Sequence, residues 1–313
     1  MSELRFVAGS DAMAVWRDEL LSGTPPTLYP VGVGDLAYVQ LGPGLVTLLG
    51  GAPGAGKTAL AMQFVLDALR LTQPLRVVVC NVEMPPGELL NRQLARIAGV
   101  DLTSIRHRRL TAEHGERIDA GLATMEPLAE RLCFVRAPFT LDNVAATADA
   151  FRGDLLLLDY IQRIAPPGEH KDHRGSVNAL MDFLRKFTDE GYAILAVAAV
   201  GRTKDTKGRS SYDANGLNLA SFKESGELEY GADSAYLLCP DGDGETVTLR
   251  CLKDRYGEPR DIALHFDRPC QRFTASTDGM AGHAPKAEKG KLQSELAALW
   301  EQTDAADEGG EYE

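Results

Sequence analysis

The chain has 313 residues, 44% of them hydrophobic, and a formal net charge of −12 at pH 7. That length and apolar content allow one large domain with a substantial core and short extensions, whereas the acidic balance does not indicate a nucleic-acid-binding surface spread over the whole protein. No apolar run is long enough to cross a membrane, no signal-peptide pattern is present, and the cysteines form no Cys-x-x-Cys pair, so we expect a cytoplasmic protein without a zinc site.

Residues 1–40 read as a lead-in to the main domain. The stretch "SDAMAVWRDELLSG" predicts a short helix that Ser10 or Asp11 caps and Gly23 ends. Its apolar side chains recur on one face: Met13, Trp16 and Leu20. This helix either packs on its own domain or contacts another molecule.

Residues 41–275 alternate between short apolar runs and amphipathic stretches. Runs such as "LVTLLG", "RVVVCNV", "DLLLLD" and "AILAVAAV" predict buried strands, with helical patterns between the early ones. This order predicts an α/β fold with a largely parallel, twisted sheet covered by helices on both faces. The last runs, "TVTLRCL" and "DIALHF", are separated by "KDRYGEPR" and predict a C-terminal antiparallel hairpin.

Residues 276–313 differ in character from the domain before them. "STDGMAGHAPKAEKG" resembles a linker, "KLQSELAALWEQT" predicts a short amphipathic helix, and "DAADEGGEYE" predicts an acidic disordered tail. From Thr277 onward, nine Asp and Glu against three Lys give −6, half of the acidic excess of the chain.

A phosphate-binding pattern follows the first apolar run of the domain. Glycines at its turn let backbone N–H groups surround a phosphate, Lys57 supplies a cation, Thr58 offers a hydroxyl to Mg²⁺, and the following helix presents its positive end. The pattern predicts a P-loop for ATP. The expected nucleotide contacts are Gly51, Ala52, Pro53, Gly54, Ala55, Gly56, Lys57, Thr58 and Ala59.

Two carboxylates stand at the ends of later apolar runs. Asp159 ends "DLLLLD" and is the expected Walker-B acid, a second Mg²⁺ residue beside Thr58. Glu83 follows "RVVVCNV" and is placed to polarise a water molecule that attacks the γ-phosphate. Alone, Glu83 reads as an exposed acid at a strand end. Together the pair favours hydrolysis over simple binding and over a small-molecule kinase.

The order of these motifs resembles the C-terminal, RecA-like ATPase domain of DnaB-type replicative helicases. The resemblance covers about residues 24–274 and rests on "GPGLVTLLGGAPGAGKTALAMQF", "NVEMPPGELLNRQLARIAGVDLTSIR", "LLLLDYIQRI", "SFKESGELEYGADSAYLL" and "LKDRYGEPRDIALHF". It implies an ATP- and Mg²⁺-dependent helicase that acts as a six-membered ring on single-stranded DNA. It also implies that Lys57, Thr58, Asp159 and Glu83 have the roles assigned above.

The resemblance adds a basic pair, Lys253 and Arg255, within "KDRYG". In the family this pair reaches the γ-phosphate of the neighbouring subunit, as an arginine finger that stabilises charge in the transition state. Without the resemblance, both residues read as part of a solvated turn.

Two loops correspond to the family's channel loops, residues 163–176 and residues 202–219. The second is basic and polar without aromatic residues, which suits contact with a single-strand backbone but fits an ordinary surface loop almost as well. The candidate DNA-binding residues in the two loops are Arg174, Arg202, Lys204, Lys207 and Arg209.

The chain departs from the family pattern at one position of the core. Ala199 stands where the family has a glutamine that senses the γ-phosphate, so either Arg202 replaces the glutamine or the coupling of hydrolysis to DNA is altered. We also expect a stand-alone form without the family's helical N-terminal collar, in which the lead-in helix takes the part of the linker helix that docks on the adjacent subunit.

Two functions remain open from the sequence. The favoured one is a helicase or translocase motor on single-stranded DNA, with a loader or primase-type protein as a candidate partner. The alternative is a non-unwinding, ATP-dependent assembly or regulatory module that forms rings or filaments on DNA or protein.

Overall fold

A computed structural model describes residues 7–166, 173–201, 203–204, 210–211, 222, 231–242 and 244–275. For residues 173–177, 203–204 and 210–211 it describes the backbone but not the side chains. The predicted linker, amphipathic helix and acidic tail of residues 276–313 lie outside the described residues.

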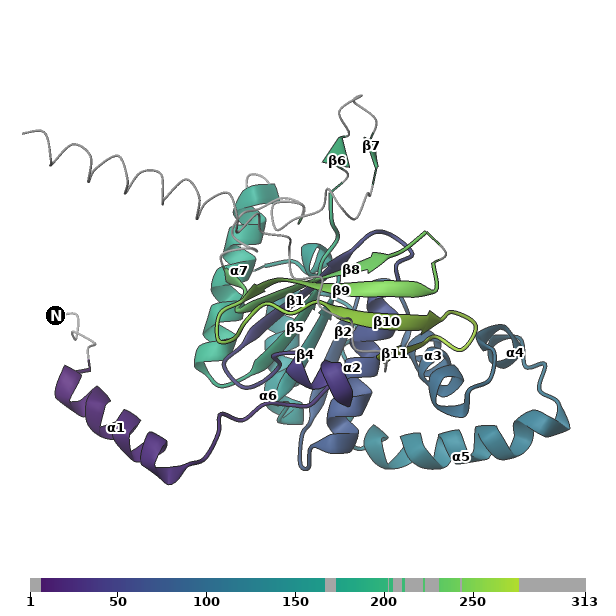
Figure 1. The fold of residues 1–313 in the computed structure, drawn as a ribbon, viewed down its shortest axis with the longest axis horizontal. Coiled ribbons are helices and arrows are strands. Elements are labelled where there is room, and N and C mark those ends of the chain that lie inside the picture. Colours follow the sequence, from purple (N-terminus) through teal and green to yellow (C-terminus); the bar gives the residue numbers. More distant parts are fainter. Residues whose placement is uncertain are drawn as a thin grey trace, which may run out of the picture. The chain divides into compact units, whose positions relative to one another are not determined.

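Within this part of the chain, nine strands form one sheet with the order β11-β10-β9-β8-β1-β5-β4-β2-β3 (Figure 1). The strands of this sheet are β1 (Val46–Gly51), β2 (Val77–Asn81), β3 (Leu132–Phe134), β4 (Leu155–Asp159), β5 (Ala193–Val197), β8 (Ser234–Pro240), β9 (Thr246–Asp254), β10 (Ile262–Asp267) and β11 (Arg272–Ala275). A separate short pair consists of β6 (Thr203–Lys204) and β7 (Ser210–Ser211).

The helices alternate with the strands along the chain. They are α1 (Gly9–Ser22), α2 (Lys57–Leu71), α3 (Pro86–Ala98), α4 (Leu102–Arg106), α5 (Ala112–Ala129), α6 (Leu141–Phe151) and α7 (His173–Asp189), with the 3-10 turns η1 (Gly34–Tyr38) and η2 (Ile161–Arg163).

The sheet is mixed in the way that the sequence predicts. All pairings from β3 to β8 are parallel, whereas β8, β9, β10 and β11 pair antiparallel in succession. The predicted C-terminal hairpin is β9 with β10, paired for example at Leu249 and Ile262. The antiparallel part is larger than predicted, because β8 and β11 extend it on both sides.

Helices cover both faces of the central strands, which are buried throughout (Figure 1). Alternate side chains of a strand point to opposite faces, so Leu155 and Leu157 pack with α2 while Leu156 and Leu158 pack with α6 and α7. The continuous apolar runs of the sequence follow from this double burial.

The lead-in helix α1 is present and ends at Gly23, whose φ of 67° is left-handed, as predicted. The predicted cap is wrong: Ala8 occupies the N-cap position, no side chain accepts a bond there, and both Ser10 and Asp11 lie inside the first turn. No residue of α1 is buried.

Candidate nucleotide-binding and catalytic site

The predicted phosphate loop connects the end of β1 to the start of α2. Gly54 and Gly56 have left-handed φ values of 77° and 95°, which side chains disfavour. A Cβ atom on Gly56 would lie 2.8 Å from Cζ of Phe273. That ring stacks on Phe266 with the centroids 4.0 Å apart, so strands β10 and β11 brace the loop.

Lys57 lies inside this loop. Its side chain is buried, and Nζ donates hydrogen bonds to the carbonyl oxygens of Gly51 at 2.8 Å and Ala52 at 2.9 Å. The ammonium group also lies 5.5 Å from the centroid of the Tyr160 ring. Burial lowers the pKa of Lys57, and the nearby carboxylates of Asp159 and Glu83 oppose that shift. The amine is therefore held inside the predicted phosphate loop, near the Asp159 and Glu83 carboxylates.

Asp159 lies at the carboxyl end of β4, beside the start of α2. One carboxylate oxygen, Oδ2, accepts hydrogen bonds from Thr58 Oγ1 and from Asn81 Nδ2, both at 2.7 Å. The other oxygen, Oδ1, is buried and has no hydrogen-bond partner among the described residues. Burial raises the pKa of Asp159 to about 6, while the Thr58 hydrogen bond and the Lys57 charge pull it down.

This arrangement fits Mg²⁺. A buried carboxylate oxygen without a partner among the described residues and a neighbouring hydroxyl are the oxygen donors that a hard cation prefers. Asp159 and Thr58, the two residues predicted to hold the ion, are brought into direct contact. Mg²⁺ retains several waters and phosphate oxygens as ligands, so a site with two protein oxygens is sufficient.

Glu83 lies at the same end of the strands, two residues after the end of the neighbouring strand β2. The Oδ1 atom of Asn81 accepts the backbone N–H groups of Glu83 at 3.0 Å and Met84 at 2.7 Å, which fixes the turn. Asn81 thus connects Asp159 and Glu83, a role not predicted from the sequence. The available signal was an asparagine at the end of an apolar run, a residue type that commonly forms an Asx turn with the backbone two residues on.

The carboxylate of Glu83 lies 3.2 Å from the guanidinium of Arg163 in η2, and both side chains are exposed. The preceding residue, Gln162, bonds to the backbone of Ala199: Ala199 N donates to Oε1 at 3.1 Å, and Nε2 donates to the Ala199 carbonyl at 3.2 Å. Whether Ala199 replaces the family's glutamine stays a prediction; in the structure its backbone is tied to η2, the turn that follows β4.

The predicted finger residues and the phosphate loop lie at opposite ends of the strands. Gly51 pairs with Leu238 in β8, whereas Asp254 pairs with Ser234 at the other end of that strand. The four-residue step from Ser234 to Leu238 corresponds to about 13 Å along the strand. Arg255 therefore lies away from the phosphate loop of its own chain, and Lys253, at the end of β9, lies with it.

Arg255 is anchored rather than extended. Its guanidinium forms an ion pair of 2.8 Å with Asp233, whose side chain is 1% exposed. The second Asp233 oxygen accepts from Arg185 at 3.0 Å and from the Val46 backbone N–H at 2.9 Å. Neither Asp233 nor Arg185 was predicted, because their partners are remote in sequence.

The predicted DNA-binding residues lie largely outside the described part of the chain. Arg202, Lys207 and Arg209 are not described, and for Lys204 in β6 and Arg174 in α7 only the backbone is described. Within the second predicted loop, β6 and β7 pair antiparallel.

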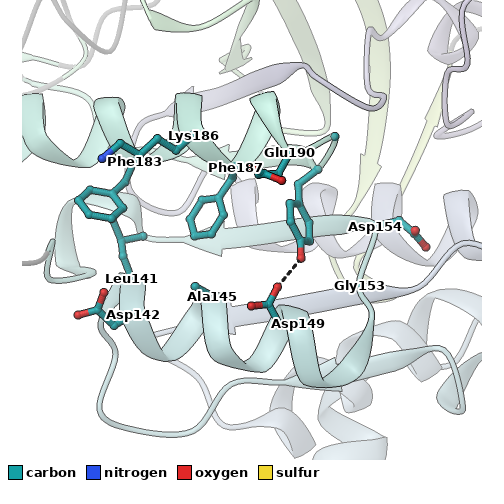
Figure 2. A pocket seen from close by; sticks show the side chains of 12 residues that line it. Leu141, Asp142, Ala145, Asp149, Gly153, Asp154, Phe183, Lys186, Phe187 and Glu190 are labelled. Carbon is teal, nitrogen blue, oxygen red and sulfur yellow. Dashed lines mark hydrogen bonds between the residues drawn. The ribbon is translucent and has the colours of Figure 1, made fainter. Parts of the chain in front are cut away.

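A separate cavity of about 570 Å³ lies between α6 and α7 (Figure 2). Phe183, Phe187 and Tyr192 line it, and the Tyr192 hydroxyl donates to Asp149 at 2.9 Å. It borders Asp154, just before β4, so it lies at the amino ends of the strands. Ligands of open α/β sheets bind at the carboxyl ends, and the cavity is therefore not the nucleotide site.

The described residues show neither a metal-binding cluster nor a membrane-spanning helix. They contain no group of three or more His, Cys, Asp and Glu side chains that could hold a metal ion. In the same residues, no helix has the length and apolar character that a membrane span requires.

Comparison with protein families identifies the domain. The model of the DnaB-like helicase C-terminal domain matches residues 35–275. A probable plasmid replicative DNA helicase of Chlamydia trachomatis serovar L2 is 23% identical over 255 residues, or 79% of this chain and 54% of the relative. The replicative DNA helicase DnaC of Bacillus subtilis is 22% identical, over 71% of this chain and 50% of its own. The chain thus spans about half the length of these relatives.

Solved structures with the same fold include an ATPase domain and a longer helicase chain. The ATPase domain matches with a TM-score of 0.74 and 18% identity, over 86% of this chain and 99% of its own. The longer chain is a DnaB-like replicative helicase, solved in a study of its interactions with primase. It matches with a TM-score of 0.72 and 17% identity, over 87% of this chain and 67% of its own.

Proposed function

The chain belongs to the DnaB-like helicase C-terminal domain family, and we propose that it hydrolyses ATP in an oligomeric ring that moves on single-stranded DNA. One observation carries this proposal. At the carboxyl ends of the parallel strands the structure brings together Lys57, Thr58, Asp159 and Glu83, while Arg255 is anchored at the opposite ends of the strands.

The phosphate loop binds the nucleotide through this chain's own groups. Backbone N–H groups of the glycine turn face the β-phosphate, and the start of α2 adds its positive end. Lys57 exchanges its two carbonyl partners for phosphate oxygens. Asp159 and Thr58 hold Mg²⁺, which neutralises developing phosphate charge when it is bound.

Glu83 orients the attacking water and accepts its proton. Its backbone is fixed by Asn81, which also bonds to Asp159, so the base and the metal-binding carboxylate keep a constant spacing. The pairing of Glu83 with Arg163 has to loosen before the carboxylate engages water.

Completion of the site by a second copy is part of the proposal. Arg255 follows β9, beside the amino end of β8, too far from the phosphate loop of its own chain to serve it, so a neighbouring subunit supplies the cation that stabilises the transition state. A head-to-tail contact of this kind closes into a ring when the rotation between subunits allows it. We propose a homohexamer.

Two surfaces with exposed apolar side chains support self-association. Met13, Trp16 and Leu20 of α1 are each more than half exposed. A groove of about 280 Å³ between α3 and α5 is lined mainly by apolar side chains, among them Leu90, Leu94, Leu122 and Met125. We propose that α1 of one copy docks in this groove of the next. The double change Trp16→Ala and Leu20→Ala is expected to reduce oligomer mass without unfolding the domain.

The two predicted loops supply the DNA contacts in this proposal, and a loader or primase-type protein is its candidate partner. The test is ATP turnover with and without single-stranded DNA, together with strand displacement, using Lys57→Ala as the inactive control. Stimulated turnover with displacement supports the motor. Turnover that DNA leaves unchanged supports the assembly or regulatory module.

A further inference from the structure

The three-residue turn η2 contacts two functional segments through adjacent residues. Gln162 holds the Ala199 backbone with two hydrogen bonds of 3.1 and 3.2 Å, and Arg163 pairs with Glu83 at 3.2 Å. Ala199 lies between β5 and β6, on the path from the sheet edge to the predicted DNA-contacting loop. Two contacts of η2 therefore connect the Ala199 segment to the proposed catalytic base, Glu83.

The two contacts differ in strength. The Gln162 side chain both accepts from and donates to one backbone unit in a partly buried position, so it follows Ala199 closely. The Arg163 side chain is 62% exposed and that of Glu83 is 41% exposed, so their ion pair is weak and easily separated. A shift of the Ala199 segment is thus expected to carry η2 with it and to break the pair with Glu83 first.

We propose that Gln162 and Arg163 couple DNA binding to hydrolysis: Arg163 restrains the Glu83 carboxylate, and Gln162 releases it when the Ala199 segment moves. This rests on the proposed function, since it assumes that Glu83 is the base and that DNA acts through the loop after β5. It assigns to the Gln162 side chain the relay that Ala199 has no polar side chain to perform. Both residues are positioning residues, because neither is assigned a contact with the reacting atoms.

The test uses variants with opposite expected effects on the full chain. Arg163→Leu removes the restraint, so DNA-independent turnover rises about two- to fivefold, the range that an exposed ion pair supports, and DNA adds little. Arg163→Lys keeps the charge and restores a lower basal rate. Gln162→Met matches the side chain in length but forms neither bond, so the basal rate stays low and stimulation by DNA is lost.

The double variant Gln162→Met with Arg163→Leu is expected to match Arg163→Leu alone, because Gln162 acts through Arg163. Arg136→Leu, an exposed arginine elsewhere on the domain, is the matched control and keeps wild-type rates and stimulation. Thermal unfolding and the KM for ATP are measured for each variant. The KM is expected to stay at the wild-type value throughout. Thermal stability should stay at the wild-type value for the variants of Arg163 and Arg136 alone, and variants with Gln162→Met should unfold at a lower temperature, because they lose the two hydrogen bonds to Ala199.

Two failures remain distinguishable. Wild-type turnover that single-stranded DNA does not change contradicts the proposed function itself. If the wild type is stimulated but Arg163→Leu lowers basal turnover or keeps full stimulation, Arg163 does not restrain Glu83. Full stimulation of Gln162→Met likewise contradicts the relay through Ala199.

Discussion

The anchoring of Arg255 by Asp233 leads to a prediction that joins stability to activity. Asp233→Asn keeps the size of the side chain and an oxygen that accepts from Val46 N–H, but it removes the negative charge between Arg255 and Arg185. Charge-assisted hydrogen bonds contribute about 1.5–3 kcal/mol each when fully buried. Arg255 is 42% exposed and Arg185 is 32% exposed, so water compensates part of each loss.

Discounting each bond to about 1 kcal/mol gives a loss of about 2 kcal/mol in the free energy of unfolding. With a urea m-value of about 2–3 kcal/mol/M, the unfolding midpoint falls by about 0.7–1 M. Asp233→Ala also leaves the buried Val46 N–H without its acceptor and is expected to cost about 1–3 kcal/mol more. The exposed Asp182→Asn on α7 is the control, with no change expected.

Urea unfolding followed by circular dichroism measures these shifts, and ATP turnover measures the consequence for the finger. Asp233→Asn is expected to bind nucleotide normally but to hydrolyse it slowly, because Arg255 loses its anchor. A variant as stable as the wild type to within about 0.5 kcal/mol would refute the reasoning, since such a difference is typical of a surface change away from any such network.

Three further predictions concern the nucleotide site. Because burial raises the pKa of Asp159 to about 6 and Mg²⁺ requires the ionised form, Mg²⁺-nucleotide binding is complete above that pH and weakens as pH falls through it. Calorimetry at about pH 5.5 should show an affinity about fourfold lower than at neutral pH, after correction for Mg²⁺-ATP formation in buffer; a flat profile contradicts an ionised Asp159 ligand. Gly56→Ala adds a Cβ atom 2.8 Å from Phe273 in a left-handed turn, so it should lower the free energy of unfolding by about 2–4 kcal/mol and abolish nucleotide binding. Gly54→Ala, whose Cβ atom meets nothing, should lower it by only about 1–2 kcal/mol. Equal losses of the two variants in thermal unfolding would exclude a clash between residue 56 and Phe273. Glu83→Gln should retain nucleotide and Mg²⁺ binding while turnover falls about 10²–10⁴-fold, and near-normal turnover would remove Glu83 from the role of base.

The phosphate loop and the sheet were predictable because their signals are local. A strand, a glycine turn, Lys57 and a helix follow one another directly, and Asp159 and Glu83 each end an apolar run. Parallel strands place such ends at one edge, so the meeting of these residues follows from the strand order. The antiparallel extension was only partly predictable, since "SAYLLC" reads equally well as a parallel or an antiparallel strand.

The contacts that organise the site were not predictable from local patterns. Asn81 bonds to Asp159 across 78 residues, and Arg163 pairs with Glu83 across 80. The bond between Gln162 and Ala199 depends on the register of β4 against β5, which sequence periodicity does not specify. The cap of α1 was misassigned for a different reason, because the helix begins before the polar residues that cap it most favourably.

The central claim, that two copies complete each nucleotide site, is tested most directly by mixing two inactive variants. Lys57→Ala has a defective phosphate loop with an intact finger, and Arg255→Ala has the reverse. If the finger acts between subunits, mixed oligomers of verified mass regain turnover at about a quarter of their sites, as expected for random head-to-tail assembly. If mixed oligomers form and remain as inactive as either variant alone, the account of a shared site is contradicted.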